Sequence, residues 1–375
     1  MHNSWKNLTA LMFILEMGMG SSGVLHAQTA HFNTANRTNK MEKLIQELGL
    51  DPKMSSQDDI ERAGNILREK GFEGILLIAP PKIDVDSGGG LPLLGFDAHG
   101  TNDRDGMGFD YSAVLVATEL GGGETMANSL RRVHEDARPP KSGIRQPPGR
   151  VMGRFSSNAR ERLPEIPWKP GAVSLVVLLF DQRSNQARVT LASDHVDDDA
   201  PGQGANARVM PVFPPLNGEK PSGADYPSYS KNDGSPPVPA QFAINMSVNP
   251  EFRHEADGKC ALRGSFFLPV APGNVVPRDA SGKPAVDVGD PAARAVIPIA
   301  LVIMGNQMPG AFVIRLKVPV YGAFEATAGA EAAAGHFNID LNAMEDMPKS
   351  SQMYTIWAFS GEVIGGAVKV NFAPN

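Results

Sequence analysis

An apolar run from Val173 to Phe180, interrupted only by Ser174, predicts a central β-strand that is buried on both faces. The following segment, Asp181 to Gln186, has the polar composition of a turn, and Asn185 suits a left-handed conformation there. From Ala187 to Leu191 apolar and polar residues alternate, as in a strand with one face in the core and one in water. These patterns together predict a β-hairpin.

Short runs of strand character recur over most of the chain after Gly71. Three of them alternate with period two, and each places one set of apolar side chains on a single face: Phe312, Ile314, Leu316, Val318; Phe337, Ile339, Leu341; Val368, Val370, Phe372. Other strands are expected around Ile75–Ile78, Val114–Val116, Phe242–Ile244, Ala261–Val270 and Val296–Met304. Short alternating strands separated by turns favour a mostly β fold of antiparallel β-sandwiches.

Two helices precede these strands. Met41, Leu44, Ile45 and Leu48 have helical spacing, and Gly49 follows them. Ser56 and Asp59 form a capping pattern before a second apolar series that ends at Gly71. The pattern therefore predicts a short helical hairpin.

The loss of apolar periodicity between two strand-rich regions divides the chain. The segment 194–240, in the middle of the chain, is rich in Pro, Gly, Asp, Asn and Ser and is expected to be a mobile linker. The predicted parts are a signal peptide (1–27), a helical hairpin segment (28–72), a first β-sandwich domain (73–193), a Pro/Gly-rich linker (194–240) and a second β-sandwich domain (241–375).

Two local features bear on the kind of sandwich. Pro170–Val173 and Pro309–Phe312 are alike and each opens a strand, which is a hint of duplication, but these four positions leave open whether the two sandwiches are duplicates. Gly171 before the strand, Asp181 closing it and Asn185 in the turn resemble a hairpin of bacterial immunoglobulin-like modules. The resemblance covers about twenty residues and implies an immunoglobulin-like fold.

The N-terminus has the order of a secretory signal. Lys6 precedes the mainly apolar run Leu8–Leu15, and small residues lead to Ala27, where cleavage is expected. The alternative is a buried N-terminal helix. Spanning a bilayer takes roughly 20 apolar residues, and neither this run nor any later run in the chain is that long. No transmembrane segment is therefore expected, and the protein is predicted to be secreted or periplasmic.

Composition and charge narrow the function classes. The chain has 375 residues, 42% of them hydrophobic, and a formal net charge of −6, which excludes a wholly disordered chain and gives no electrostatic footprint for nucleic acid. The segment Arg131–Arg162 is locally basic. It is either a solvated surface paired with acidic residues or a contact for an anionic polymer or lipid. The single cysteine, Cys260, begins a strand and is expected to be a buried thiol.

One weak metal-binding pattern is present. Asp103, Asp105 and Asp110 flank a glycine-containing turn, and oxygen ligands at alternate positions suit Ca²⁺. The alternative is a solvated turn. Thr101 and Ser112 stand where a complete helix–loop–helix site needs ligands.

Motifs for nucleophilic hydrolases, nucleotide binding and zinc proteases are missing from the sequence. The leading hypothesis is therefore a non-catalytic protein that binds a protein, glycan or envelope partner or has an envelope-structural role. The alternative is a secreted hydrolase acting on a glycan or ester, with carboxylates brought together by the fold, for example His99 with Asp103 or Asp110. Whether the protein is an enzyme stays open at this point.

Overall fold

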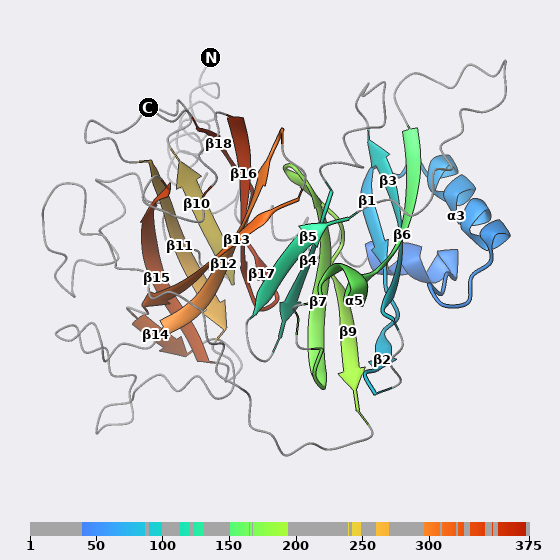
Figure 1. Ribbon diagram of the computed structural model, residues 1–375, viewed down its shortest axis with the longest axis horizontal. Coiled ribbons are helices and arrows are strands. Elements are labelled where there is room, and N and C mark those ends of the chain that lie inside the picture. The colour runs from blue at the N-terminus through green and yellow to red at the C-terminus, as the bar shows by residue number, and fades with distance from the viewer. Residues whose placement is uncertain are drawn as a thin grey trace, which may run out of the picture. The chain divides into compact units, whose positions relative to one another are not determined.

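The computed structural model describes the chain in separate stretches (Figure 1). These are residues 40–86, 90–99, 113–120, 124–130, 151–164, 166, 168–193, 239, 242–248, 260–269, 296–307, 310–319, 322–325, 331–341, 347 and 352–372. They fall into two units, which are described separately. The first unit contains residues 40–50 and 56–66, and the second contains residues 51–55 and those from 67 onward.

The two predicted helices are confirmed. One covers residues 40–48, and the other is α3 (Gln57–Glu69). Gly49 and Gly71 have φ angles of 60° and 62°, the left-handed conformation that commonly ends a helix. At the C-terminal end of α3, Phe72 N–H donates to Leu67 C=O and Gly71 N–H donates to Arg68 C=O. These bonds use carbonyls that the helix itself leaves unpaired.

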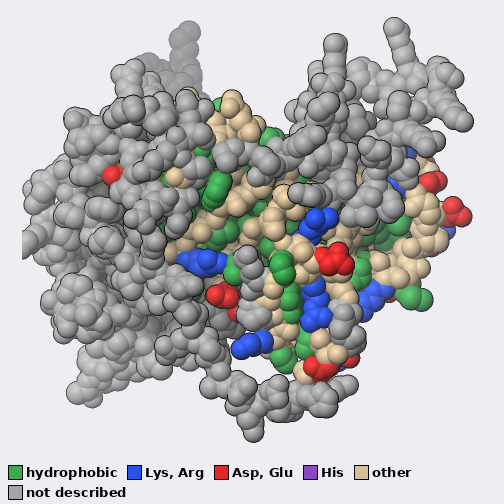
Figure 2. Space-filling model, in the orientation of Figure 1, with side chains coloured by type: hydrophobic (Ala, Val, Ile, Leu, Met, Phe, Trp, Pro, Cys, Tyr) green, Lys and Arg blue, Asp and Glu red, His purple; other side chains and the backbone are tan. Residues whose placement is uncertain are grey.

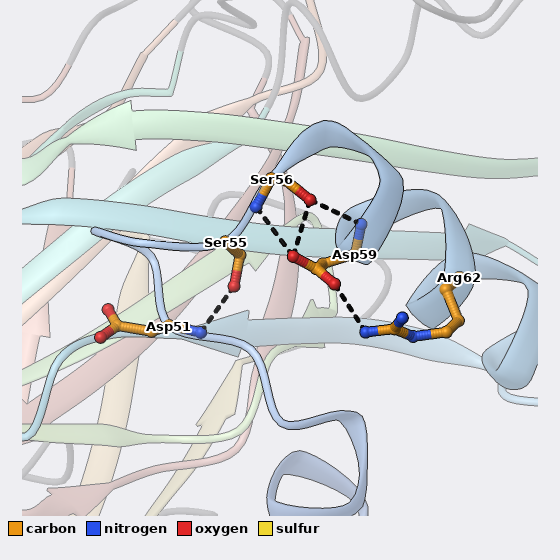
Figure 3. Close-up of polar contacts among 5 residues, drawn as sticks. All are labelled: Asp51, Ser55, Ser56, Asp59 and Arg62. Atoms are coloured by element: carbon orange, nitrogen blue, oxygen red, sulfur yellow. Dashed lines mark hydrogen bonds and ion pairs between the residues drawn. The ribbon is translucent and has the colours of Figure 1, made fainter.

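The start of α3 has the predicted capping arrangement (Figure 3). The Asp59 N–H donates to Ser56 Oγ at 3.2 Å, and the Ser56 N–H donates to Asp59 Oδ2 at 3.0 Å. Arg62 Nη2 lies 2.6 Å from Asp59 Oδ1. The Ser56 hydroxyl and N–H, and then Arg62, hold the pKa of Asp59 below its ordinary value. The reciprocal bonds explain why the helix begins here.

The second unit is mostly β, and its described strands form four sheets. Sheet I has the order β1 (Gly74–Ile78), β3 (Pro92–His99), β6 (Val151–Asn158). Sheet II has the order β2 (Lys82–Asp84), β9 (Ala187–Ala192), β7 (Gly171–Leu179), β4 (Val114–Glu119), β5 (Thr125–Ser129), with β8 (Gln182–Arg183) also paired to β7. The short helix α5 (Ala159–Arg162) follows β6.

The remaining strands form sheets III and IV. Sheet III has the order β13 (Phe312–Pro319), β12 (Val296–Gly305), β16 (Gln352–Ser360), β17 (Val363–Ile364), with β18 (Val368–Phe372) also paired to β16. Sheet IV has the order β10 (Ala243–Val248), β11 (Ala261–Pro269), β15 (Glu331–Asp340), β14 (Gly322–Glu325). All described pairings are antiparallel except that of β2 with β9.

Three apolar cores join the sheets in the order I, II, III, IV. The first core contains side chains of sheets I and II, the second those of sheets III and IV, and the third those of sheets II and III. Strand β7 contributes Leu175 and Val177 to the first core and Val176 and Leu178 to the third. Its two apolar faces, predicted from sequence, are thus explained by two separate cores.

The fold is duplicated. We call β1–β9 the first repeat and β10–β18 the second repeat. Each antiparallel pairing of the first repeat recurs in the second in the same chain order: β1–β3 as β10–β11, β3–β6 as β11–β15, β4–β5 as β12–β13, β4–β7 as β12–β16, β7–β8 as β16–β17 and β7–β9 as β16–β18. Only β2–β9 and β14–β15 lack a counterpart among the described strands.

The duplication extends to individual glycine–phenylalanine pairs. Gly95 lies opposite Phe155, and a Cβ on Gly95 would come within 2.0 Å of the Phe155 ring. Gly264 lies opposite Phe337 with the same separation of 2.0 Å. In both repeats, a phenylalanine therefore covers a glycine of the neighbouring strand.

The last residues of β6 and β15, the strands that carry Phe155 and Phe337, also make equivalent hydrogen bonds in the two repeats. Asn158 Oδ1 accepts from Leu91 N–H at 2.9 Å, and Asp340 Oδ1 accepts from Cys260 N–H at 3.0 Å. Cys260 is buried, as predicted. The residue that follows Asn158 or Asp340 forms a backbone hydrogen bond to the same partner residue. Ala159 N–H donates to Leu91 C=O and Leu341 N–H donates to Cys260 C=O, both at 2.8 Å.

The sequence similarity between Pro170–Val173 and Pro309–Phe312 occurs at strands that are not equivalent in the two repeats. Pro170–Val173 opens β7 and Pro309–Phe312 opens β13, but the pairings make β16 the counterpart of β7. The four similar residues therefore carry no information about which strands are equivalent.

The predicted left-handed conformation at Asn185 is wrong. Among the described non-glycine residues only Phe180 has a positive φ, 51°. Asn185 instead uses its side chain, which accepts from Leu77 N–H at 2.8 Å and donates to Leu77 C=O at 2.9 Å. Its carboxamide thereby pairs with β1 as a neighbouring strand would, and joins sheets I and II.

Two predicted segments lie outside the described residues. They are the signal peptide, 1–27, and the linker, 194–240, apart from Pro239. Within the stretches that the structure describes, no helix is long and apolar enough to cross a membrane.

Candidate functional site

The sequence-predicted metal ligands Asp103, Asp105 and Asp110 lie outside the described residues. His99, which the hydrolase hypothesis pairs with Asp103 or Asp110, is the last residue of β3. In the part of the chain that is described, no three His, Cys, Asp or Glu side chains come close enough to hold a metal ion. Neither the calcium prediction nor the His99 pairing is tested by the structure.

The structure instead brings together a set of residues between the repeats. Sheets II and III pack through a buried apolar surface, here called the inter-repeat face. It consists of Val114, Val116, Val176 and Leu178 from the first repeat and Ala300, Val302, Met304, Trp357 and Phe359 from the second. All these side chains are at most 4% exposed. Because they are apolar and excluded from water, they stabilise the contact between the repeats.

Two ion pairs connect the hairpins of the two repeats. Arg188 Nη1 lies 2.8 Å from Glu362 Oε1, and Lys369 Nζ lies 2.6 Å from Asp181 Oδ2. The four side chains are 51–64% exposed, so each pair contributes at most about 1 kcal/mol. The pairs set the relative register of the repeats more than they stabilise them.

The ion pairs are reciprocal. Val173↔Val189 in the first hairpin corresponds to Tyr354↔Val370 in the second, which makes Arg188 the counterpart of Lys369. Similarly, Asp181 and Glu362 occupy the same turn position, because each precedes the short strand of its hairpin. The base of each repeat therefore contacts the acid of the other.

A tryptophan adds a polar contact to the inter-repeat face. Trp357 is 4% exposed, and its Nε1–H donates to Phe180 C=O at 2.7 Å. Phe180 has the left-handed φ of 51°, which is costly for a residue with a bulky side chain. The counterpart of Phe180 is Gly361, with φ 56°, so the second repeat makes the same turn with the residue best suited to it.

Polar side chains add further hydrogen bonds between the repeats. Gln186 Nε2 donates to Ser174 Oγ at 2.7 Å and to Glu362 C=O at 3.2 Å. Arg315 Nη2 donates to Thr125 C=O at 3.2 Å, and Thr125 and Thr118 share a hydroxyl–hydroxyl bond of 3.2 Å. The Thr118 and Thr125 hydroxyls hold β4 to β5, whereas the Gln186 and Arg315 bonds to backbone carbonyls cross between the repeats.

A second group of interest is the end of the β4–β5 hairpin. Burial raises the pKa of Glu119 above its ordinary value, the charge of Glu124 raises it further, and Lys169 opposes the change. Glu119 N–H donates to Glu124 C=O at 2.8 Å. A carboxyl group that retains its proton more readily can act as a general acid.

The described end of the basic segment makes ordinary structural contacts. Arg160 Nη2 donates to Val85 C=O at 3.2 Å, and Arg162 Nε donates to Ser157 Oγ at 3.4 Å. Figure 2 shows basic and acidic side chains interspersed over the described part of one face, and not separated by sign. On that face, the described residues form no basic patch for an anionic polymer or lipid.

The inter-repeat residues were missed in the sequence. A usable signal was present: Asp181 and Arg188 have the same spacing as Glu362 and Lys369, and each acid follows an apolar strand. Gly153-Arg154-Phe155 and Gly335-His336-Phe337 form a second matched pair. No protein-family model matches the chain, and no curated protein sequence matches it significantly.

Proposed function

We propose that the protein is an exported, non-catalytic protein of two immunoglobulin-like β-sandwiches, with a binding or envelope-structural role. The strand orders support the immunoglobulin-like assignment. An immunoglobulin sandwich has one sheet of order A-B-E-D and a second that contains C, F and G. Taken in chain order, β10-β11-β15-β14 has the first arrangement, and β12, β16 and β18 have the second.

The observation that carries the functional proposal is the reciprocal pairing of the repeats. The hydrogen-bonding and charged side chains at this contact hold the two sandwiches together in a fixed arrangement. A fixed pair of sandwiches presents its connecting loops from a rigid scaffold, which is the usual basis of binding by such folds. We expect the partner to be a protein, a glycan or an envelope component, and not a nucleic acid, given the net charge of −6.

Export is tested by the N-terminus of the protein made in its native host. We expect the secreted or periplasmic fraction to contain a chain that begins at Gln28, as read by mass spectrometry. A full-length chain beginning at Met1 in the cytoplasm would contradict this part of the proposal.

Binding is tested by cosedimentation of the purified chain with envelope polysaccharide prepared from the host. Saturable binding without release of reducing sugar is expected. Release of sugar at a rate above that of buffer would overturn the non-catalytic assignment.

A second candidate function rests on Glu119. A secreted hydrolase acting on a glycan or ester needs an acid whose pKa is raised, and Glu119 has that property beside Glu124. Under this candidate, chromogenic glycosides and esters would be turned over, and Glu119→Gln would abolish turnover while Glu73→Gln, a surface change outside the hairpin, would not.

A further inference from the structure

Eight of the nine positions on the inter-repeat face form equivalent pairs between the repeats; the ninth, Met304, is equivalent to Thr118, which lies outside the apolar core. The strand registers align β4 with β12 and β7 with β16. The resulting pairs of equivalent positions are Val114 with Ala300, Val116 with Val302, Val176 with Trp357 and Leu178 with Phe359, and every one of these side chains belongs to the same buried core. Each repeat therefore presents the same part of its sheet to the other.

The charged contacts have the same symmetry. Arg188 contacts Glu362, and the equivalent Lys369 contacts the equivalent Asp181. Contacts of this kind, in which residue i meets j and j meets i, define an isologous interface, the type formed by two identical subunits around a twofold axis. A face built in this way is complementary to a copy of itself.

The repeats meet through side chains. Among the described strands, each ladder of backbone hydrogen bonds lies within one repeat. The contact therefore resembles an interface between two folded subunits more than a single continuous sheet.

We propose that the inter-repeat face is a self-complementary docking surface whose partner is a second copy of the same sandwich. The two repeats then recognise each other without their covalent connection. The connection between β9 and β10 raises the local concentration of the partner, but it does not create the fit.

One difference between the repeats makes the unlike pair preferable to a pair of two first repeats. The ion pairs would also form in a pair of identical repeats, as Arg188 with Asp181 or Lys369 with Glu362. Trp357 occupies the position that Val176 holds in the first repeat, and it donates to the carbonyl of Phe180. Two copies of the first repeat would lack this tryptophan and its hydrogen bond.

The experiment uses the full chain with a specific protease site inserted between residues 194 and 240. After complete cleavage, we expect the halves to elute together in gel filtration at micromolar concentration. Native mass spectrometry should show one copy of each half, and the far-ultraviolet circular dichroism should be unchanged. Elution as separate halves, or loss of the β-strand signal after cleavage, would overturn the proposal.

Charge variants of the cleaved chain test the reciprocal geometry. Arg188→Glu should weaken association of the halves about fivefold, and the added change Glu362→Arg should restore it. Lys369→Asp and Asp181→Lys should behave in the same way. Lys82→Glu, at an exposed position of β2, is the matched control and should leave association unchanged. Equal weakening by the control and by Arg188→Glu would contradict the assigned contacts.

Discussion

Arg188, on the return strand of the first repeat, forms an ion pair of 2.8 Å with Glu362, in the hairpin turn of the second. The equivalent pair, Lys369 with Asp181, is 2.6 Å long. Two contacts related in this way relate the repeats by an approximate twofold symmetry. The duplication is therefore a property of the packing as well as of the strand order.

Trp357→Phe should destabilise the protein. The variant keeps an aromatic ring in the inter-repeat face but leaves the Phe180 carbonyl without its tryptophan donor, at a cost of about 1–2 kcal/mol in the free energy of unfolding. Urea denaturation followed by circular dichroism measures this difference. Met353→Leu, at an exposed position of the same strand, is the control and should change stability little. An unchanged midpoint for Trp357→Phe would show that the hydrogen bond contributes nothing.

Gly361→Ala should cost about 1 kcal/mol because of its backbone conformation alone. Its φ is 56°, and a Cβ would meet no atom within 4 Å. Gly366 also has open space around a Cβ, without a left-handed φ, so Gly366→Ala should be neutral or slightly stabilising. Thermal denaturation of the two variants separates conformational strain from steric effects. Equal melting temperatures for the two variants would refute this explanation.

Gly264→Ala should destabilise the second repeat by about 1–3 kcal/mol, because the new methyl group would overlap the Phe337 ring. The change Phe337→Leu on the same background should recover part of the loss by making room. Gly95→Ala should have a similar effect through Phe155. Guanidinium denaturation measures all of these. A full-sized loss in the Gly264→Ala, Phe337→Leu double variant would argue against the steric cause.

Glu119→Gln should stabilise the protein at neutral pH and have little effect near pH 4. In the folded state, burial and then the charge of Glu124 raise the pKa of Glu119 above its ordinary value. Protonation therefore favours the folded state, and this contribution is fully present below the unfolded pKa and is lost as pH rises through the folded pKa. Melting temperatures of both proteins from pH 4 to pH 8 provide the measurement.

Glu124→Gln tests the origin of that shift. Removing the Glu124 charge should move the carboxyl titration of Glu119, followed by NMR, to lower pH. A stability difference between wild type and Glu119→Gln that does not vary with pH would contradict the assignment.

The sequence-based calcium site can be tested by melting temperature. With a dissociation constant of about 10⁻⁴ M, Ca²⁺ at about 1 mM would stabilise the protein by roughly 1.4 kcal/mol and raise its melting temperature by a few degrees. Asp105→Ala should remove the increase. If the melting temperature of the wild type is the same in Ca²⁺ and in chelator, the turn is only solvated.

Local patterns in the sequence determined the elements of this protein. Capping by Ser56 and Asp59, the glycines after both helices and the alternation in β9 act between residues close in the chain, so they could be read without a structure. The apolar character of both faces of β7 likewise predicted burial on two sides.

Tertiary structure decided what covers the second face of β7, because that face meets side chains of β12 and β16, far away in the chain. It also decided the role of Asn185, whose side chain bonds to Leu77 across two sheets in place of a left-handed turn. The same holds for Asp181, Arg188, Glu362 and Lys369, because a reciprocal contact depends on how two folded repeats dock, and no local pattern encodes that geometry.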